Sequence, residues 1–259
     1  MSILAEIVEA SRSTLAESKR RLPLRDLEQL ALEAPARPHF AEAFRAPGVH
    51  IIAELKKASP SKGVIRAEFP YLDLAMELAQ NGATALSVLT EPHFFLGSLE
   101  YLRRTAEVVS IPLLRKDFLY DTYQIWEAKA FGASAALLIA AMLEPAQIRD
   151  LTQLAHEIGL SILGEAHDES EIDILLDTPV DLIGVNARNL RTFETSLDRV
   201  AGLIGRISSD RLPVAESAIS TPEDVRRLQE SGAAGFLIGE GIMRAEKPGE
   251  KLRELLGTA

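Results

Sequence analysis

The stretch Ile51–Gly63, IIAELKKASPSKG, brings an acid and a base to the end of an apolar run. The run breaks off at Glu54, and Lys56 follows two residues later. Residues two apart in an extended chain face the same side. A carboxylate and an ammonium placed in this way can exchange protons with a bound molecule. The stretch is therefore typical of a strand that ends in a catalytic site.

Other apolar runs along the chain also end at ionisable or amide side chains. These ends are Thr90 and Glu91, Lys116 and Asp117, Glu165, Asn186 and Arg188, Glu216 and Ser217, and Gly239 and Glu240. If they meet, Lys56, Lys116 and Arg188 gather three cations in a protein of formal net charge −10, which suits a small, multiply charged anion. Glu54 and Glu165 would lie among them, where crowding shifts pKa values towards those useful for proton transfer. A ring of salt bridges that only closes the structure is the alternative.

Bringing these ends together requires parallel strands, and the sequence from His50 onward alternates short apolar runs with helical patterns. We predict strands near 50–55, 85–89, 112–115, 135–139, 160–165, 182–186, 212–216 and 235–238. We predict helices near 71–81, 98–109, 121–131, 144–157, 168–176, 196–206, 221–231 and 247–256. Eight such units predict a closed (β/α)8 TIM barrel, whose usual size is about 250 residues. An open doubly wound sheet is the alternative, but it normally carries a glycine-rich first turn.

Helix boundaries have their own signals. Glycines follow four of the predicted helices, where a left-handed C-cap is needed: Gly82, Gly132, Gly159 and Gly232. Thr221 and Pro222 are typical of a helix start. Residues 3–20 predict an amphipathic helix, a second one opens at Pro23 and runs to about Leu32, and prolines then mark an irregular link. We therefore predict one barrel domain over residues 1–259, with residues 1–47 as an N-terminal helical extension.

Composition excludes several classes of function. The chain of 259 residues has no cysteine, which rules out disulfides, thiolate catalysis and cysteine-bound metals. Its five histidines show no paired metal spacing, so we expect no metal. The acidic balance argues against nucleic-acid binding, and no apolar window of membrane-spanning length occurs. The first thirty residues lack the apolar centre of a signal peptide, so we expect a cytoplasmic protein.

Six blocks resemble one family in order and spacing: IIAELKKASPSKG, ALSVLTEPHFFLGS, PLLRKDF, GVNARNL, VAES and FLIGEGIMR. Together they resemble the indole-3-glycerol-phosphate synthases of tryptophan biosynthesis, over essentially the whole chain. The resemblance implies decarboxylating and dehydrating ring closure of 1-(2-carboxyphenylamino)-1-deoxyribulose 5-phosphate, without cofactor or metal. It also implies a monomer able to associate with other tryptophan-pathway enzymes. Its N-terminal helices are expected to fold across the barrel mouth.

The resemblance also implies roles for single residues. Lys116 matches the principal general acid and Glu165 the carboxylate that takes a proton during dehydration. Lys56 matches a second lysine, and the step at which each lysine acts stays open. Glu54 and Asn186 match groups that orient these side chains and hold the substrate. Arg188 matches the guanidinium that binds the carboxylate, for which a planar fork is well suited.

The remaining matches concern binding. The phosphate site corresponds to Ser59, Ser217, Ala218, Gly239 and Glu240, the last two at the eighth strand end where barrels often bind phosphate. The apolar slot for the anthranilate ring corresponds to Pro60, Phe95, Phe118, Leu137 and Leu190. A plain core role is the alternative for each of these five. Trp126, on a predicted helix, is expected to pack rather than bind ligand.

Two positions depart from the family pattern. Ala218 stands where the family usually has glycine, so it is strained if the backbone there needs a positive φ. Gly164 stands before Glu165 where a β-branched residue is common, which is expected to loosen the support of Glu165.

Two other functions fit the same residues. An isomerase or aldolase would use Lys56 or Lys116 as a Schiff-base nucleophile. A catalytically silent barrel is the third hypothesis. Against it stands the joint presence of Glu54, Lys56, Lys116, Glu165, Asn186 and Arg188.

Overall fold

The structure, a computed structural model, describes residues 3–187, 196–208 and 210–258. Within these residues, eight parallel strands close into a barrel in the order β1-β10-β9-β8-β7-β6-β5-β4, and β4 pairs with β1. The strands are β1 (Ile51–Leu55), β4 (Ala85–Leu89), β5 (Leu113–Lys116), β6 (Ala135–Ile139), β7 (Ser161–Ala166), β8 (Leu182–Asn186), β9 (Leu212–Glu216) and β10 (Gly235–Ile238). The predicted (β/α)8 barrel is therefore confirmed, and the open sheet is excluded.

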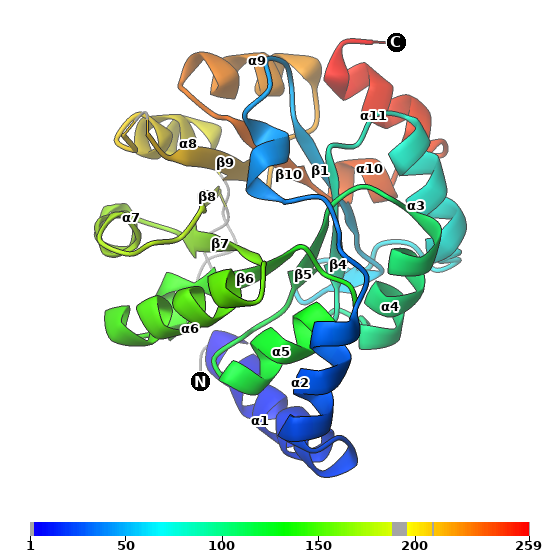
Figure 1. Ribbon diagram of the computed structural model, residues 1–259. Helices are drawn as coiled ribbons and strands as arrows, with labels where there is room; N and C mark the ends of the chain where they lie inside the picture. The colour runs from blue at the N-terminus through cyan, green and yellow to red at the C-terminus, as the bar shows by residue number, and fades with distance from the viewer. Residues whose placement is uncertain (1–2, 188–195, 209, 259) are drawn as a thin grey trace.

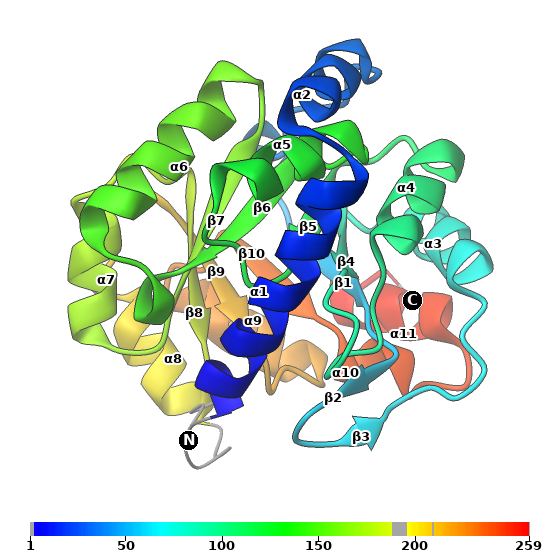
Figure 2. The ribbon, with the colours of Figure 1, turned by 90° about the horizontal axis from the view of Figure 1, so that it is seen from below.

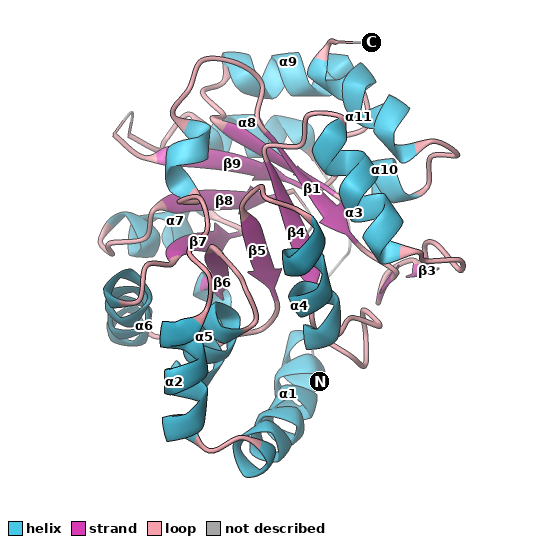
Figure 3. Ribbon diagram, turned by 45° about the vertical axis from the view of Figure 1, so that its right-hand side comes forward, coloured by secondary structure: helices cyan, strands magenta, loops and turns pink. Residues whose placement is uncertain are grey.

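Helices surround the barrel, as Figures 1 and 3 show. They are α3 (Tyr71–Gln80), α4 (Leu99–Val108), α5 (Thr122–Ala130), α6 (Pro145–Glu157), α7 (Glu169–Leu176), α8 (Leu197–Ile204), α9 (Pro222–Glu230) and α11 (Pro248–Leu256). Shorter elements join them: β2 (Ala58–Ser59), β3 (Gly63–Val64), η2 (Ala140–Met142) and α10 (Glu240–Met243). Each predicted strand and helix is present within two residues of its predicted bounds. The short β2–β3 hairpin was not predicted.

The helix-boundary signals are confirmed. The backbone is left-handed after the four helices as predicted, with φ of 96° at Gly82, 86° at Gly132, 75° at Gly159 and 105° at Gly232. At the start of α9, the Thr221 side chain accepts a hydrogen bond from the Asp224 backbone N–H, and Pro222 occupies the first turn. These local rules set the helix ends and therefore the lengths of the loops at both ends of the barrel.

The N-terminal segment reaches three parts of the barrel rather than only its mouth. Helix α1 (Ile3–Arg21) lies across the end of the barrel in Figure 2 and lines the cavity there. Helix α2 (Leu24–Glu33) instead packs on α5, where Leu27 joins Tyr123 and Trp126 in an apolar cluster. The expectation that both helices cover the mouth is thus wrong for α2, because its apolar face is used on α5. Trp126 packs, as predicted.

The proline-marked link contains a short helix that closes the opposite end of the barrel. Phe40, just before η1 (Ala41–Phe44), and Phe44, its last residue, pack with inward-facing barrel residues such as Ile52 and Leu114. The backbone N–H of Ala41 also donates to Ser161 Oγ at the start of β7. The link was predicted to be irregular, yet it fills the barrel floor. In the described part of the chain, no helix is long and apolar enough to cross a membrane.

Candidate active site

Strand alternation directs the polar strand ends into the barrel. Apolar residues that face the interior include Ile52, Leu114, Leu163 and Leu182. Two residues further along each strand come Glu54, Lys116, Glu165 and Gly184, with Asn186 after the last. Because side chains alternate with a period of two, these residues face the same interior at the carboxyl end of the strands. The polar side chains of the site thus form the next layer above the apolar layers of the barrel interior.

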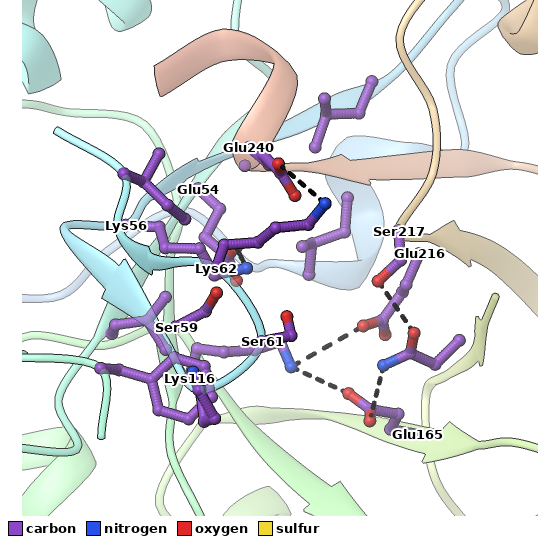
Figure 4. A pocket seen from close by; sticks show the side chains of 18 of the residues that line it. Glu54, Lys56, Ser59, Ser61, Lys62, Lys116, Glu165, Glu216, Ser217 and Glu240 are labelled. Carbon is purple, nitrogen blue, oxygen red and sulfur yellow. Dashed lines mark hydrogen bonds and ion pairs between the residues drawn. The ribbon is translucent and has the colours of Figure 1, made fainter. Parts of the chain in front are cut away.

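The strand ends open into a cavity of about 500 Å³, shown in Figure 4. Such a volume lies in the range of about 300–1,000 Å³ that small-molecule sites occupy. The cavity is lined by every predicted site residue that the structure describes: Glu54, Lys56, Ser59, Pro60, Phe95, Lys116, Phe118, Leu137, Glu165, Asn186, Ser217, Ala218, Gly239 and Glu240. Arg188 and Leu190 lie outside the described residues.

Lys116 and Glu165 form the central pair of the cavity. Lys116 Nζ donates to Glu165 Oε2 at 2.8 Å, and Asn186 Nδ2 donates to Glu165 Oε1 at 3.1 Å. Ser217 Oγ in turn donates to Asn186 Oδ1 at 2.8 Å. Figure 4 shows this chain of contacts running across the ends of β5, β7, β8 and β9. Four distant segments therefore fix one acid and one base in hydrogen-bonding distance.

Glu54 and Lys56 form a second pair on the other side of the cavity. Their ion pair measures 2.5 Å between Lys56 Nζ and Glu54 Oε2, and Glu54 is almost fully buried. A Cβ at Gly239 would collide with the Glu54 carboxylate. The glycine at the end of β10 therefore makes room for a buried acid, in addition to any role in ligand binding.

Glu216 is a third buried acid, which was noted as a strand end but not included among the candidates. Its Oε2 lies 3.7 Å from Lys116 Nζ, and its Oε1 is buried without a hydrogen-bond partner. A Cβ at Gly184 would collide with that oxygen. The signal available in the sequence was the phase of β9, since Val214 faces the interior and Glu216 is two residues further on.

Burial and mutual charge shift the pKa values of Lys116, Glu165 and Glu216. Burial alone would lower the pKa of Lys116, but the charges of Glu165, Glu216 and Glu54 outweigh it and raise that pKa. Burial would raise the pKa of Glu165, but the charges of Lys116 and His167 bring it down to about 2. Burial and the neighbouring Glu165 charge raise the pKa of Glu216 well above its usual value. Lys116 and Glu165 are therefore held charged, whereas Glu216 binds a proton more readily than an ordinary glutamate.

Two further cations border the predicted phosphate site. Arg244 Nε contacts Glu240 Oε1 at 3.0 Å, and Lys62 Nζ lies 3.8 Å from the same oxygen. Both side chains line the cavity, and neither was among the predicted site residues. They follow no strand end: Lys62 lies between β2 and β3, and Arg244 follows α10. The alternation of side chains along the strands therefore does not predict that Lys62 and Arg244 reach the cavity.

The backbone that follows Glu216 is left-handed at two consecutive non-glycine residues, with φ of 66° at Ser217 and 60° at Ala218. The condition for strain at Ala218 is therefore met.

The expectation for Gly164 is wrong, because Leu175 fills the space that a side chain there would take, with Cδ2 only 2.8 Å from an added Cβ. Glu165 remains buried and hydrogen-bonded.

The opposite wall of the cavity is apolar. Phe95 and Phe118 lie with their ring centroids 6.0 Å apart, and Leu137 and Pro60 line the same cavity. Ile3, Leu4 and Ile7 of α1 also line it. One wall thus offers aromatic and aliphatic surface, while the floor offers paired charges.

The whole chain matches known proteins of one family. The sequence profile described as "Indole-3-glycerol phosphate synthase" matches residues 4–255. Two curated proteins of that description, from Polaromonas sp. (strain JS666 / ATCC BAA-500) and Paracidovorax citrulli (strain AAC00-1), are each 45% identical over 261 residues, covering 98% of this chain and 98% of theirs. The chain belongs to the indole-3-glycerol phosphate synthase family. The resemblance found in the sequence is confirmed.

As a member of the indole-3-glycerol phosphate synthase family, the protein is a carboxy-lyase of tryptophan biosynthesis, and its substrate is a phosphorylated sugar–anthranilate. Solved structures resemble it in fold. A thiamine phosphate pyrophosphorylase from Pyrococcus furiosus gives a TM-score of 0.60 at 15% identity, covering 82% of this chain and 94% of its own. A 3-hexulose-6-phosphate synthase from Salmonella typhimurium gives 0.62 at 13% identity, covering 81% and 98%. At such identities the similarity concerns the barrel alone.

Proposed function

We propose that the cavity converts 1-(2-carboxyphenylamino)-1-deoxyribulose 5-phosphate to indole-3-glycerol phosphate, with Lys116 as general acid and Glu165 as general base. The observation that carries this assignment is the 2.8 Å contact between Lys116 Nζ and Glu165 Oε2 on the floor of the cavity. Ring closure needs a proton at the ketose oxygen, and dehydration needs a proton to leave the carbon next to nitrogen. A charged lysine beside a carboxylate supplies both functions.

The coupling of the pair supports an order for the two steps. While Lys116 is charged, it holds the pKa of Glu165 low, at about 2, so Glu165 is a weak base. Once Lys116 has given its proton to the carbonyl oxygen, that lowering disappears and burial raises the proton affinity of Glu165. The acid step therefore prepares the base step. Asn186, which donates to Glu165 Oε1, keeps the carboxylate in position throughout.

The remaining roles follow the two sides of the cavity. Lys56 is proposed to bind the substrate carboxylate, with Glu54 holding its ammonium 2.5 Å away. Arg188 is proposed as a second carboxylate ligand by family resemblance. Ser59, Ser217 and the backbone at Gly239 are proposed to bind the phosphate, which carries about −1.5 to −2 charges.

The apolar side chains of the cavity are proposed to enclose the anthranilate ring. Phe95 and Phe118 offer an aromatic wall, and Leu137 and Pro60 extend it. Leu190 is included by family resemblance. Helix α1 borders this wall and would help to exclude water while charge develops on the substrate.

A Schiff-base mechanism is the competing chemistry for a lysine in a barrel. A nucleophilic lysine must be neutral, which requires a lowered pKa. Surrounding carboxylates instead raise the pKa of Lys116. Borohydride treatment in the presence of substrate should therefore leave no covalent adduct on this residue, and a trapped adduct by mass spectrometry would overturn the general-acid role.

The direct test of the proposed reaction is to add the substrate to the purified protein and follow indole fluorescence. We expect fluorescence to rise with release of one CO₂ per product, and to do so in the presence of a chelator. The Glu165→Gln variant should form product at least about 10²-fold more slowly, since it keeps the shape of the side chain and removes the base. Product formation at the unmodified rate would exclude Glu165 from proton transfer.

A further inference from the structure

His167 is a buried histidine that the roles above do not use. It follows β7 directly, two residues beyond Glu165, and is only 8% exposed. The same alternation that directs Glu165 inward brings the imidazole to the back of that carboxylate. The residue therefore lies behind the base, on the side away from the bound substrate's expected position beside Lys116.

Glu171 fixes the imidazole from the first turn of α7. His167 Nδ1 lies 3.1 Å from Glu171 Oε2, and the backbone N–H of His167 donates to the same oxygen at 2.7 Å. The Glu171 backbone is itself held by Asp168, whose side chain caps α7 at 3.0 Å. Because an ionised carboxylate only accepts hydrogen bonds, Nδ1 must carry a hydrogen. The remaining ring nitrogen, Nε2, is therefore the one that titrates.

Nε2 faces Glu165. The distance between His167 Nε2 and Glu165 Oε1 is 3.4 Å, and Nε2 is buried without a hydrogen-bond partner. If the ring is neutral and Glu165 is ionised, a lone pair faces a carboxylate oxygen, and neither atom carries a hydrogen. A single proton placed between them turns this repulsion into a charge-assisted contact. At 3.4 Å the two atoms are close enough to form a proton-exchange pair once that proton is present.

The stoichiometry of the proposed reaction requires such a route. The substrate carboxylate departs as neutral CO₂, and the other products are water and a phosphate ester of unchanged charge. One negative charge is therefore cancelled by one proton taken up from solvent in every turnover. Substrate in the cavity would cover Lys116 and Glu165, so the proton must come from a donor that is charged before the ligand binds and does not lie between the ligand and these two groups.

We propose that His167 is that donor: held by Glu171, it passes its stored Nε2 proton to Glu165 Oε1, and Glu165 returns it to Lys116 Nζ. In this step the Nε2–H bond breaks and an O–H bond forms on Glu165. The O–H bond then breaks as the N–H bond on Lys116 forms, which restores the charged acid and the ionised base. After the products leave, His167 regains its Nε2 proton from solvent through the emptied cavity by way of Glu165, because Nδ1 keeps its own hydrogen for Glu171. His167 is thus a positioning residue that acts through Glu165, and the inference rests on the proposed reaction.

The surrounding charges favour a protonated imidazole. Burial would lower the pKa of His167, but the hydrogen bond that it donates to Glu171 and the charges of Glu165 and Glu171 outweigh this and raise that pKa, against an opposing contribution from Lys116. Arg199 of α8 also faces this residue, through Nη2, which donates to the His167 carbonyl at 2.5 Å. The imidazolium is the donor, so turnover should fall as pH rises through the raised pKa.

The test is the His167→Asn variant, because asparagine can still donate to Glu171 in the manner of Nδ1 but has no titrating Nε2. We expect kcat to fall about 10²-fold with KM within about twofold, the low end of what proton transfer contributes. The high-pH decline of kcat should disappear. Imidazolium buffer added at fixed pH should raise the variant's kcat in proportion to its concentration and leave the unmodified enzyme unchanged.

A second variant and a matched control keep the test decisive. Glu171→Gln removes the carboxylate charge, so the high-pH decline should move to lower pH by about one unit or more. His156→Asn removes a similar histidine–carboxylate contact, 2.9 Å to Asp181 and outside the cavity lining, and should leave kcat and its pH profile unchanged.

Two results would overturn the relay. One is unchanged turnover of His167→Asn across the pH range. The other is a loss of activity that no buffer acid restores, which would make the histidine a purely structural contact. Failure of the proposed reaction itself is separate, since then the unmodified protein would form no indole product at all.

Discussion

Two buried clusters of charge begin at neighbouring residues of β5 and differ in how fully their hydrogen bonds are satisfied. Arg115 points outward, towards α5, while Lys116 points into the cavity. Arg115 is held on every side: Nη2 lies 2.8 Å from Glu127 Oε2 and 3.3 Å from Asp117 Oδ2, Nη1 donates to the Gln124 carbonyl at 2.9 Å, and Nε donates to Thr90 Oγ1 at 3.2 Å. Its donors are directed at fixed acceptors, which is a structural arrangement.

The inner cluster is only partly satisfied. Lys116 has one short contact, to Glu165, and a longer one of 3.7 Å to Glu216, whose second oxygen has no partner. An ammonium with free hydrogen-bonding capacity beside a cavity can donate to a ligand, whereas a guanidinium bound on all sides cannot. The difference teaches that burial of charge alone does not identify a catalytic group. What identifies it is an incomplete set of partners next to space for a ligand.

The largest expected effect comes from removing the inner cation. Lys116→Gln should lower kcat by about 10²–10⁴-fold, because the proton donor is lost. KM should change much less, since other groups bind the charged ends of the substrate. Steady-state formation of indole-3-glycerol phosphate, followed by its fluorescence, measures both constants, and circular dichroism checks the fold. Turnover equal to that of the unmodified enzyme would show that Lys116 is not the proton donor. The inner cluster would then not differ from the outer one in catalytic role.

Removing the outer cation should affect folding instead. Arg115→Met leaves Asp117 and Glu127 buried without their partner, and breaking a buried pair in this way destabilises a protein by about 3–5 kcal/mol. Urea unfolding measures the loss, and the folded fraction should keep its kcat. Arg103→Met on α4 is the control, since its ion pairs to Glu100 and Glu107 are exposed and should contribute little. A variant that stayed stable but lost activity would show that the outer cluster takes part in catalysis.

The third acid of the inner cluster should make stability depend on pH. The pKa of Glu216 is raised in the folded protein, so between its unfolded value, about 4.3, and the raised value the folded state binds more protons than the unfolded state. Stability from this group therefore falls as pH rises above about 4.3. Glu216→Gln should remove that fall and be the more stable protein at neutral pH. Urea midpoints measured from pH 4.5 to 8 test this, and parallel curves for both proteins would contradict it.

The sequence allowed the barrel and most of the cavity to be predicted because two regular signals coincide. Alternation along β1, β5 and β7 places Glu54, Lys116 and Glu165 in one layer, and the helix caps set the loops around them. The same counting along β9 leads to Glu216. Counting alone does not show its importance, which rests on the 3.7 Å contact with Lys116 that the closed barrel provides.

The features that could not be predicted depend on contacts made by segments whose sequence has no helical or strand periodicity. Phe40 and Phe44 lie in a proline-marked link, and only the closed barrel provides the floor that they fill. Lys62 and Arg244 reach the cavity from a hairpin and a short helix, where no strand phase indicates a direction. The tautomer of His167 likewise depends on Glu171, which only the start of α7 brings into contact.

The smallest expected effect concerns the backbone beside the inner cluster. Ala218 has a φ of 60°, a conformation that costs an L-residue with a Cβ about 1–2 kcal/mol and that glycine adopts freely. Glycine also gains freedom in the unfolded chain, which offsets about 0.5–1 kcal/mol. Ala218→Gly should therefore stabilise the protein by about 1 kcal/mol or less, and phosphate should bind equally well or more tightly. Thermal unfolding with and without inorganic phosphate measures both. A clear loss of phosphate binding would mean that the inner cluster relies on the alanine methyl to hold the adjacent backbone in place. The strained backbone at Ala218 would then contribute to binding.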